Sequence, residues 1–367
     1  MTTLLLTGAT GAVGQPLLAA LLRSRRFGRV IVPVRGDAAR RARQMRGALA
    51  AEEVDTGPLV TVAADLADPA ADLASWPAAD VVVHAAACTR FRAPAAELAA
   101  INVGATARLL AWAGALPRRP RFVHLSTLCV AGCRTGVVPE EPLRPAPAFI
   151  NAYEHSKWEA EQLVFGSDLR PEIVRLGIVA GRESDGRIPR PGALHAALRW
   201  MRRGLLPLVP GEPATGVDLI STDLVARFVD RLLAVAPEPH RLCHLTAGPA
   251  RLSIAELIAL GAGVFAAADP AWRTRQILPP VVAPRTAFAA FRRSIEQSRD
   301  LLFNQVLASA DAFLPMLLHP KVFATGRAES AWGGPLPWPE PRTFAARVLG
   351  ASLDAADGRA GSAEEAA

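Results

Sequence analysis

Tyr153 and Lys157 are the residues whose types and spacing most directly suggest chemistry. Tyr153 is the only tyrosine among 367 residues, and Lys157 and Lys321 are the only lysines. A spacing of four places the first two side chains on one face of a helix that begins near residue 153. A nearby ammonium stabilises a phenolate and lowers the pKa of the phenol, which can then exchange a proton with a carbonyl oxygen. The pair therefore predicts acid–base chemistry at a carbonyl group.

Three further polar residues are candidates for the same site. Ser126 and Thr127 end the strand that we predict over residues 121–127, and a hydroxyl there would hydrogen-bond the substrate carbonyl and help to hold the oxyanion. Asn102 lies within a predicted helix, 95–114, where asparagine is a poor helix former. We expect Asn102 to hold a water molecule or the backbone of a strand end beside the site, and a purely local hydrogen bond is the alternative.

A glycine-rich loop, TGATGAVG, lies between the first predicted strand, 3–8, and the first predicted helix, 16–24. Its first glycine allows a tight turn, its second lets the backbone approach a pyrophosphate, and its third lets the helix pack closely on the strand. The helix N-terminus offers free N–H groups to the anion. In this strand–turn–helix context the motif predicts a dinucleotide-binding loop, with the expected cofactor contacts Thr7, Gly8, Thr10, Gly11, Ala12, Val13 and Gly14.

The second predicted strand, 29–35, ends in an arginine rather than an acidic residue. An acidic residue at this point would bind the ribose 2′-hydroxyl, whereas Arg35 favours a 2′-phosphate. Arg40 and Arg41 could add to the same pocket. The pattern therefore favours NADPH over NADH, and the alternative is a surface arginine in an arginine-rich chain.

The ends of the next two strands, predicted at 59–66 and 80–87, should complete the cofactor site. Asp65 and Leu66 are expected near the adenine. Small side chains follow the fourth strand, where the backbone would pass close to the cofactor, at Ala85, Ala86 and Ala87. Tyr153 and Lys157 are also expected to contact the cofactor.

Short apolar runs alternate with helical patterns through the first half of the chain. Further strands are predicted at 121–127 and 172–181, and a further helix at 154–166. Continuous apolar strands that alternate with helices indicate a parallel sheet covered on both faces. We therefore predict the α/β class: a Rossmann-type, doubly wound parallel sheet with a smaller, mainly helical C-terminal substrate-binding region.

The regular pattern weakens after residue 181. Proline, glycine and arginine dominate 182–216, and later elements are predicted as a strand at 242–248 and helices at 222–236, 253–263, 285–318 and 343–354. We expect an NADP-binding Rossmann domain with the catalytic residues in 1–181. A substrate-binding region would fill 182–355, with 217–250 returning to the Rossmann core, and a disordered tail would follow in 356–367.

Composition limits the classes of function. The formal charge is +7, but the arginines are scattered and no basic block with interleaved aromatic residues appears, so we expect no nucleic-acid partner. The four cysteines lack the paired spacing of a zinc site, and we expect no metal. No secretory signal or membrane-length apolar run is apparent, which predicts a cytoplasmic protein. Membrane association through 285–323 is an alternative that we do not favour.

Together these motifs resemble the extended short-chain dehydrogenase/reductase superfamily. The resemblance covers roughly residues 1–250 and places the catalytic hydroxyl at Thr127, with Ser126 second. INVGATARLLAWA, FVHLSTLCVAG and YEHSKWEAEQLV look like the thioester reductase and fatty acyl-CoA reductase branch. That resemblance implies NADPH-dependent reduction of an acyl thioester to an aldehyde, sometimes onward to an alcohol. One departure is Leu176, where the family usually has proline.

The expected substrate is a hydrophobic acyl thioester, because the C-terminal region is rich in apolar runs. The basic surface would suit an acidic acyl carrier protein or the phosphates of coenzyme A. The alternatives are an NAD(P)-dependent epimerase/dehydratase, a ketone or alcohol dehydrogenase, and a non-enzymatic NADP-sensing binding protein. The last would not need Tyr153 or Lys157.

Overall fold

The computed structural model describes residues 2–357, apart from 250, 270, 271, 273, 299 and 312. The predicted tail, 356–367, overlaps the end of the last helix, α13 (Pro341–Asp357), and otherwise lies outside the described residues.

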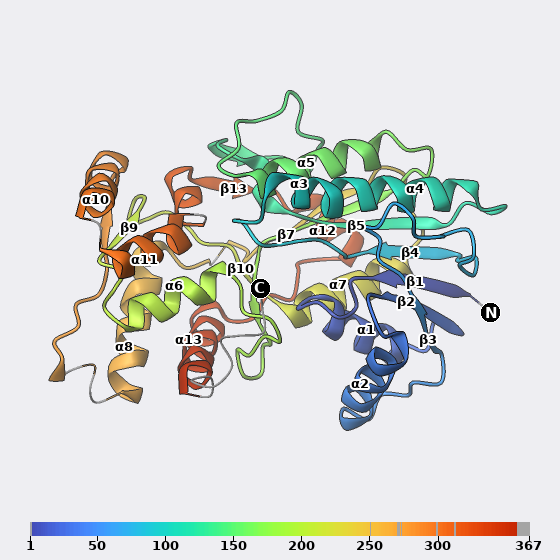
Figure 1. Cartoon of the computed structure of the whole chain (residues 1–367), viewed down its shortest axis with the longest axis horizontal. Helices are drawn as coiled ribbons and strands as arrows, with labels where there is room; N and C mark the ends of the chain where they lie inside the picture. The colour runs from blue at the N-terminus through green and yellow to red at the C-terminus, as the bar shows by residue number, and fades with distance from the viewer. Residues whose placement is uncertain are drawn as a thin grey trace.

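The centre of the fold is a sheet of seven parallel strands (Figure 1). Its order is β11-β7-β5-β4-β1-β2-β3, with every neighbouring pair parallel. The strands are β1 (Thr3–Thr7), β2 (Arg29–Val34), β3 (Leu59–Ala63), β4 (Val81–His84), β5 (Arg121–Thr127), β7 (Glu172–Leu176) and β11 (Leu242–Leu245). The strand order reverses between β1 and β4, and in such sheets ligands bind beyond the carboxyl ends of the strands at this point. The predicted fold class is confirmed.

Helices cover both faces of the sheet (Figure 1). On one face lie α1 (Gly14–Arg23), α2 (Ala38–Ala51) and α7 (Thr222–Ala234). On the other lie α3 (Ala95–Leu98), a π-helical segment (Ala99–Gly104), α4 (Ala105–Ala115) and α5 (Ala152–Phe165). Successive side chains of a strand point to opposite faces of the sheet. Leu4 and Leu6 of β1 therefore pack in the core on the α1 side of the sheet, and Leu5 packs in the core on the α4 side.

The continuous helix Ala95–Ala115 is long and apolar enough to cross a membrane, by length and composition alone. This differs from our expectation that no run has that length. Leu109 and Trp112 of this helix are buried in the core beneath the sheet. A core helix of a soluble protein passes the same test, so the finding is weak evidence for a membrane span.

The predicted strand 172–181 is two strands. Gly177 interrupts it, and β7 is followed by β8 (Ile178–Gly181), which pairs with β10 (Leu219–Ser221) outside the main sheet. The N–H of Gly177 donates to the carbonyl of Leu245 at 2.8 Å, and a Cβ at Gly177 would lie 2.7 Å from the carbonyl oxygen of Asp218. The uniform apolar pattern concealed this break because both strands are buried.

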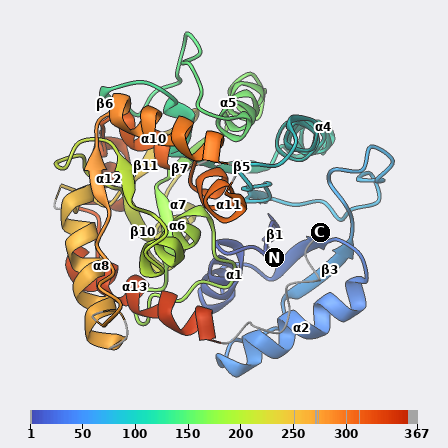
Figure 2. The same ribbon diagram turned by 60° about the vertical axis from the view of Figure 1, so that its left-hand side comes forward.

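The C-terminal region gathers at one end of the sheet (Figure 2). Its helices are α6 (Ala193–Arg202), α8 (Ile254–Ala268), α10 (Arg285–Ser298), α11 (Leu301–Asp311), a 3-10 turn (Leu314–Leu318), α12 (Gly326–Trp332) and α13. Two short strand pairs join it together: β9 (Leu208–Pro210) with β12 (Val281–Ala283), and β6 (Gly136–Val138) with β13 (Lys321–Phe323). The second pair ties residues 321–323 to the loop that follows β5, which brings the far end of the chain beside the predicted catalytic residues.

Candidate active site

The glycine loop is shaped by close backbone contacts. Gly8 has φ +73°, and a Cβ there would lie 2.6 Å from the carbonyl carbon of Ala85. A Cβ at Gly14 would lie 2.0 Å from the carbonyl oxygen of Gly8. Neither position can hold a larger residue without a backbone shift, so the loop keeps the concave form that a pyrophosphate requires.

A buried histidine orders this loop. The Thr106 hydroxyl donates to the carbonyl of Asn102 at 2.6 Å and lies 2.9 Å from Nε2 of His84. It therefore accepts the Nε2 proton, which leaves Nδ1 of His84 to accept from the Thr7 hydroxyl at 2.8 Å. Burial lowers the pKa of His84 to about 3, so the ring stays neutral. Neither His84 nor Thr106 was predicted as a site residue; the available signal was a histidine that ends an otherwise apolar strand.

The cleft beyond β1 and β4 contains most of the predicted cofactor contacts. The predicted residues that line it are Thr7, Gly8, Thr10, Gly11, Arg35, Asp65, Leu66, Ala85, Ala86 and Ala87. Three further predicted residues do not line the cleft: Ala12, Val13 and Gly14. Gly14 begins α1, and Ala12 and Val13 directly precede it. Tyr153 and Lys157 also lie outside the lining of this cleft.

Arginines surround the outer end of the cleft, where β2 ends. Arg35 and Arg41 line it, and so does Arg190, from the loop after β8. None of the three has an ion-pair partner among the described residues. The nearest acid along the chain, Asp37, caps α2 by accepting the backbone N–H of Arg40 at 2.9 Å. Arg40 itself lines no part of the cleft.

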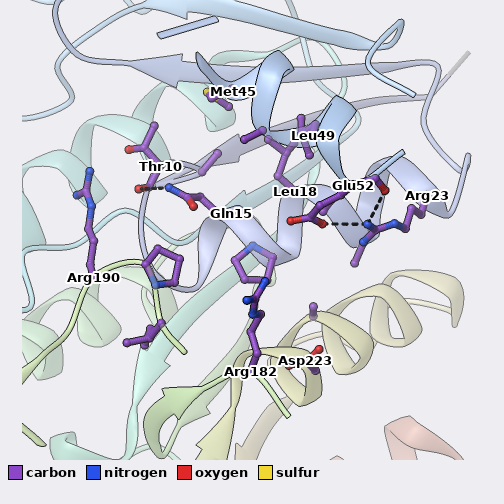
Figure 3. A pocket seen from close by; sticks show the side chains of 18 of the residues that line it. Thr10, Gln15, Leu18, Arg23, Met45, Leu49, Glu52, Arg182, Arg190 and Asp223 are labelled. Carbon is purple, nitrogen blue, oxygen red and sulfur yellow. Dashed lines mark hydrogen bonds and ion pairs between the residues drawn. The ribbon is translucent and has the colours of Figure 1, made fainter. Parts of the chain in front are cut away.

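A larger groove of about 860 Å³ adjoins this end of the cleft (Figure 3). It lies between α1, α2, α7 and the loop 182–190, and it shares Thr10, Arg41 and Arg190 with the cleft. Figure 3 shows Gln15 bonded to the carbonyl of Thr10 at 3.2 Å. None of the predicted catalytic residues lines the groove, so it extends the adenosine end of the cleft rather than the reacting end.

The predicted catalytic tyrosine is buried at the end of β5. Asn151 caps α5 by accepting the N–H of Glu154 at 3.0 Å, which begins the helix just before Tyr153. Burial raises the pKa of the Tyr153 phenol, and a hydrogen bond with the Thr127 side chain opposes that rise. The ring of Phe91 meets the tyrosine edge-on, with 4.8 Å between ring centroids. The structure therefore brings the two predicted hydroxyls together in a closed, low-dielectric site.

Lys157 lies one turn farther along α5, but its ammonium has other contacts. It donates to the carbonyl of Leu125 at 3.1 Å and lies 3.4 Å from Nε2 of His124. Burial lowers the pKa of Lys157 to about 8, which the charge of Glu161 partly opposes. The lowering of the phenol's pKa by Lys157 that we expected is not among the main influences on Tyr153 in this structure.

Asn102 holds a strand end, one of the two roles expected of it. Its side chain accepts the N–H of Cys88 at 2.8 Å and donates to the carbonyl of the same residue at 3.1 Å. It also donates to the hydroxyl of Ser156 at 2.9 Å. These bonds tie the segment after β4 to α5, and the π-helical turn around Asn102 brings its side chain to them.

Ser126 is buried, with 5% of its surface exposed, and its hydroxyl has no hydrogen-bond partner among the described residues. Buried hydroxyls are normally paired, so this oxygen is available to a bound molecule. The described residues contain no cluster of histidine, cysteine and acidic side chains that could hold a metal ion.

Comparison with known proteins assigns this arrangement to a family. The family model described as Male sterility protein, an NAD-binding domain, matches residues 6–229. The chain belongs to this family. The predicted class of NAD(P)-dependent oxidoreductase is confirmed, as is the resemblance to the thioester reductase and fatty acyl-CoA reductase branch.

Two relatives illustrate how similar the sequence of this chain is to those of known proteins. The isonitrile lipopeptide synthase of Streptomyces coeruleorubidus is 33% identical over 241 residues, covering 60% of this chain and 16% of that protein. Fatty acyl-CoA reductase 1 of Xenopus laevis is 28% identical over 187 residues, covering 46% and 36%. The chain thus spans well under two thirds of either relative.

Two solved structures share the fold. The terminal R domain from the myxalamid PKS-NRPS biosynthetic pathway superposes with a TM-score of 0.77 at 22% identity, covering 98% of this chain and 92% of that one. A thiolation-reductase di-domain from an archaeal non-ribosomal peptide synthetase gives 0.74 at 19% identity, covering 97% and 76%. At these identities the likeness shows the fold alone.

The residues present fit the dinucleotide that this family binds. Gly8 and Gly14 leave a hollow that a Cβ would fill, and Ser126 offers an unpaired buried hydroxyl. Arg35, Arg41 and Arg190 supply positive charge at the other end of the cleft. An NAD(P) site therefore runs from the arginines, past the glycine loop, toward Ser126.

Proposed function

We propose that this chain reduces an acyl thioester to an aldehyde with NADPH, with further reduction to the alcohol as an extension of the same chemistry. The observation that carries the proposal is the meeting of Thr127, at the end of β5, with Tyr153: both side chains are buried, the Thr127 side chain acts on the pKa of the phenol, and the ring of Phe91 packs edge-on against the tyrosine. Relatives named as a fatty acyl-CoA reductase and as a terminal R domain support the choice of a thioester.

The two hydroxyls would bind the oxygen of the thioester carbonyl. Both can donate to an oxyanion, and hydrogen bonds in a site that excludes water are worth more than in solution. When bound, the reduced nicotinamide supplies the hydride that the carbonyl carbon receives. The raised pKa of Tyr153 keeps the phenol protonated, so it donates a hydrogen bond to the oxyanion and retains its proton while the carbonyl re-forms.

Lys157, Ser126 and Asn102 would support this pair. We propose that Lys157 binds the ribose hydroxyls of the cofactor, because a compact ammonium with three N–H donors can hydrogen-bond to them. The unpaired hydroxyl of Ser126 would bond the cofactor or the substrate. Asn102 is a positioning residue, since it bonds the backbone of Cys88 and the side chain of Ser156.

The charges at the end of β2 support NADPH rather than NADH as the cofactor in this proposal. Three arginines without acidic partners favour a 2′-phosphate: Arg35, Arg41 and Arg190. Asp37 is engaged as the cap of α2 and does not offer its carboxylate to a ribose 2′-hydroxyl.

The substrate end would be built by the C-terminal region. Phe313 packs against Phe91, with 6.3 Å between ring centroids, so this region reaches the ring that covers Tyr153. Its apolar cluster suits a hydrophobic acyl chain. We propose coenzyme A or an acyl carrier protein as the thiol component, since one structural relative is a thiolation-reductase di-domain. A cytoplasmic location remains part of the proposal.

The test is NADPH oxidation measured with a panel of acyl-CoA thioesters, acyl carrier thioesters, aldehydes and ketones. We expect turnover of thioesters and a loss of roughly 100-fold or more in Tyr153→Phe. Turnover of ketones without thioesters would overturn the assignment and favour a ketone or alcohol dehydrogenase. An unchanged Tyr153→Phe rate would overturn the mechanism.

A further inference from the structure

A small cavity lies beside α5 and the turn that follows β5, and it shares no lining residue with the cofactor cleft. Its volume is about 50 Å³, enough for a few water molecules and too small for an acyl chain. Its lining includes apolar side chains from four segments and the polar residues Cys129, Glu154, Thr215, Asp218, His319 and Lys321. The backbone N–H of Cys129 donates to the Thr127 hydroxyl at 3.2 Å, and Glu154 follows Tyr153 directly in α5, so the cavity adjoins the reacting centre.

Glu154 faces this cavity from α5, directly after the catalytic tyrosine. It is 2% exposed, and one carboxylate oxygen accepts the backbone N–H of Ile150 at 2.9 Å. Burial of an acidic group without a salt bridge is costly, so its position calls for a role beyond helix capping, which Asn151 already performs.

Lys321 faces the same cavity from β13. It is one of the two lysines in the chain, and the reaction described above does not use it. Its ammonium donates to the carbonyl of His319 at 3.0 Å. Lys321 and Glu154 influence each other electrostatically, yet no ion pair within 4.0 Å joins them among the described contacts. A carboxyl group and an ammonium group therefore face one cavity without forming an ion pair.

Thr215 provides an independent sign that a molecule enters this space. It lines the cavity with 8% of its surface exposed, and its hydroxyl has no partner among the described residues. An unpaired buried hydroxyl beside a carboxyl group and an ammonium makes a set of polar partners that can hold a bridging water.

We infer that Glu154 and Lys321 form a proton supply for the leaving group of the reaction, with Glu154 donating the proton that the departing thiolate takes up. This inference rests on the proposed thioester reduction. The balance is simple: hydride forms the new C–H bond, the C–S bond breaks with its electron pair going to sulfur, and the Glu154 proton forms the S–H bond. The proton travels through water in the cavity, and Lys321 then faces the carboxylate that remains.

The acidity of Glu154 suits this step. Burial raises its pKa to about 7, and the charge of Lys321 partly opposes that rise. A general acid works best when its pKa lies near the working pH, and an alkyl thiolate, with a pKa of about 8.5 for its thiol, takes a proton from such an acid readily. Tyr153 is a poor source because burial raises its pKa further above its ordinary value.

The other titratable groups around the cavity do not compete. Burial raises the pKa of Cys129 to about 11, which keeps the thiol neutral. Burial lowers the pKa of His319, whose ring lies 3.3 Å from the guanidinium of Arg285. Burial raises the pKa of Asp218 as well, but its carboxylate is paired with Arg251 at 3.1 Å and accepts the N–H of Ala247, and both contacts oppose that rise.

The decisive experiment compares thioesters of an alkanethiol and an arenethiol in single turnovers, following NADPH consumption and free thiol separately. An arenethiolate is stabilised by its ring and leaves without a proton. Glu154→Gln keeps an acceptor for the Ile150 N–H and removes the acid. We expect it to consume NADPH normally, to release the alkanethiol about 100-fold more slowly and to release the arenethiol at the wild-type rate. Glu159→Gln, an exposed site on the same helix, is the matched control.

If Glu154→Gln slows the release of both thiols equally, or releases the alkanethiol as fast as wild type, the inference is wrong. Failure of wild type to reduce any thioester would instead refute the proposed function. A readout free of turnover is the infrared carboxyl band that wild type shows and Glu154→Gln lacks. We expect it to titrate near pH 7, and at higher pH in Lys321→Met. A band titrating near the ordinary value of about 4.3 would contradict the assignment.

Discussion

The ammonium of Lys157 donates to the carbonyl oxygen of Leu125 at 3.1 Å, inside the strand that ends in Thr127. Lys157 is therefore anchored to β5 itself, and its charge is held in a buried place. Because burial lowers its pKa to about 8, the charged form is lost as the pH rises through that value.

This anchoring predicts an alkaline limit to activity. We expect kcat to fall as the pH rises through about 8, because the neutral amine has lost its charge and one of the N–H donors that we assign to the cofactor ribose. Lys157→Arg should lose activity overall but lack this limit, since arginine stays charged. pH–rate profiles of the two proteins provide the measurement, and an identical limit in both would exclude Lys157 as its source.

Arg35→Ala should weaken NADPH binding by about 10- to 100-fold, the effect of losing one hydrogen bond to a charged group. NADH binding should be unchanged because NADH lacks the 2′-phosphate. Arg40→Ala is the control, since Arg40 lies five residues away and lines no part of the cleft. Fluorescence titration with both cofactors measures the difference. Equal weakening of NADPH and NADH would show that Arg35 does not read the phosphate.

Gly8→Ala should destabilise the protein by roughly 2 kcal/mol or more and abolish cofactor binding. The new Cβ would meet the backbone of Ala85 and Ala86 at 2.6 Å, and alanine disfavours φ +73°. Gly47→Ala is the matched control: Gly47 lies within α2, its added Cβ would meet no atom within 4 Å, and we expect a gain of about 0.5–1 kcal/mol. Urea unfolding measures both, and a neutral Gly8→Ala would contradict the assigned backbone contacts.

The buried ion pair of Arg175 and Glu161 should matter mainly when one partner is removed. Arg175, on β7, meets Glu161, on α5, at 2.7 Å, and both side chains are almost fully buried. Arg175→Met should cost about 3–5 kcal/mol because it strands a buried carboxylate. Adding Glu161→Met should recover much of that loss. Urea unfolding of the single and double variants measures these free energies of unfolding. If the losses of the two single variants simply add in the double variant, the two charges are not coupled.

Acid should destabilise the fold through its buried histidines. Burial lowers the pKa of His84 and of His244 to about 3, and that of His124 well below its ordinary value. The unfolded chain binds protons on these rings from about pH 6.5 downward, whereas the folded chain does not. Stability is therefore full above about pH 6.5 and falls toward pH 3. Urea unfolding across this range, with ring titration by NMR, is the measurement. A His84 ring that titrates near 6.5 would refute the buried network.

The local parts of the site could be predicted from the order of the residues. TGATGAVG, Arg35, Ser126-Thr127 and the pair of Tyr153 and Lys157 could be interpreted because each lies at a strand end or on one helical turn, where spacing fixes geometry. The parallel sheet followed from the apolar runs for the same reason. The assignment of Asn102 to a strand end was one of two expected roles, and the structure shows which bonds it makes.

The contacts between distant groups became visible in the folded chain. His84 under the glycine loop, Arg190 beside Arg35, and Lys321 across a cavity from Glu154 depend on how strands pair and where the C-terminal segment returns, as the pairing of β13 with β6 shows. The division of 172–181 at Gly177 was likewise set by contacts with residues 218 and 245. Such contacts join residues far apart in the chain, and their energies depend on burial and packing that local periodicity does not encode.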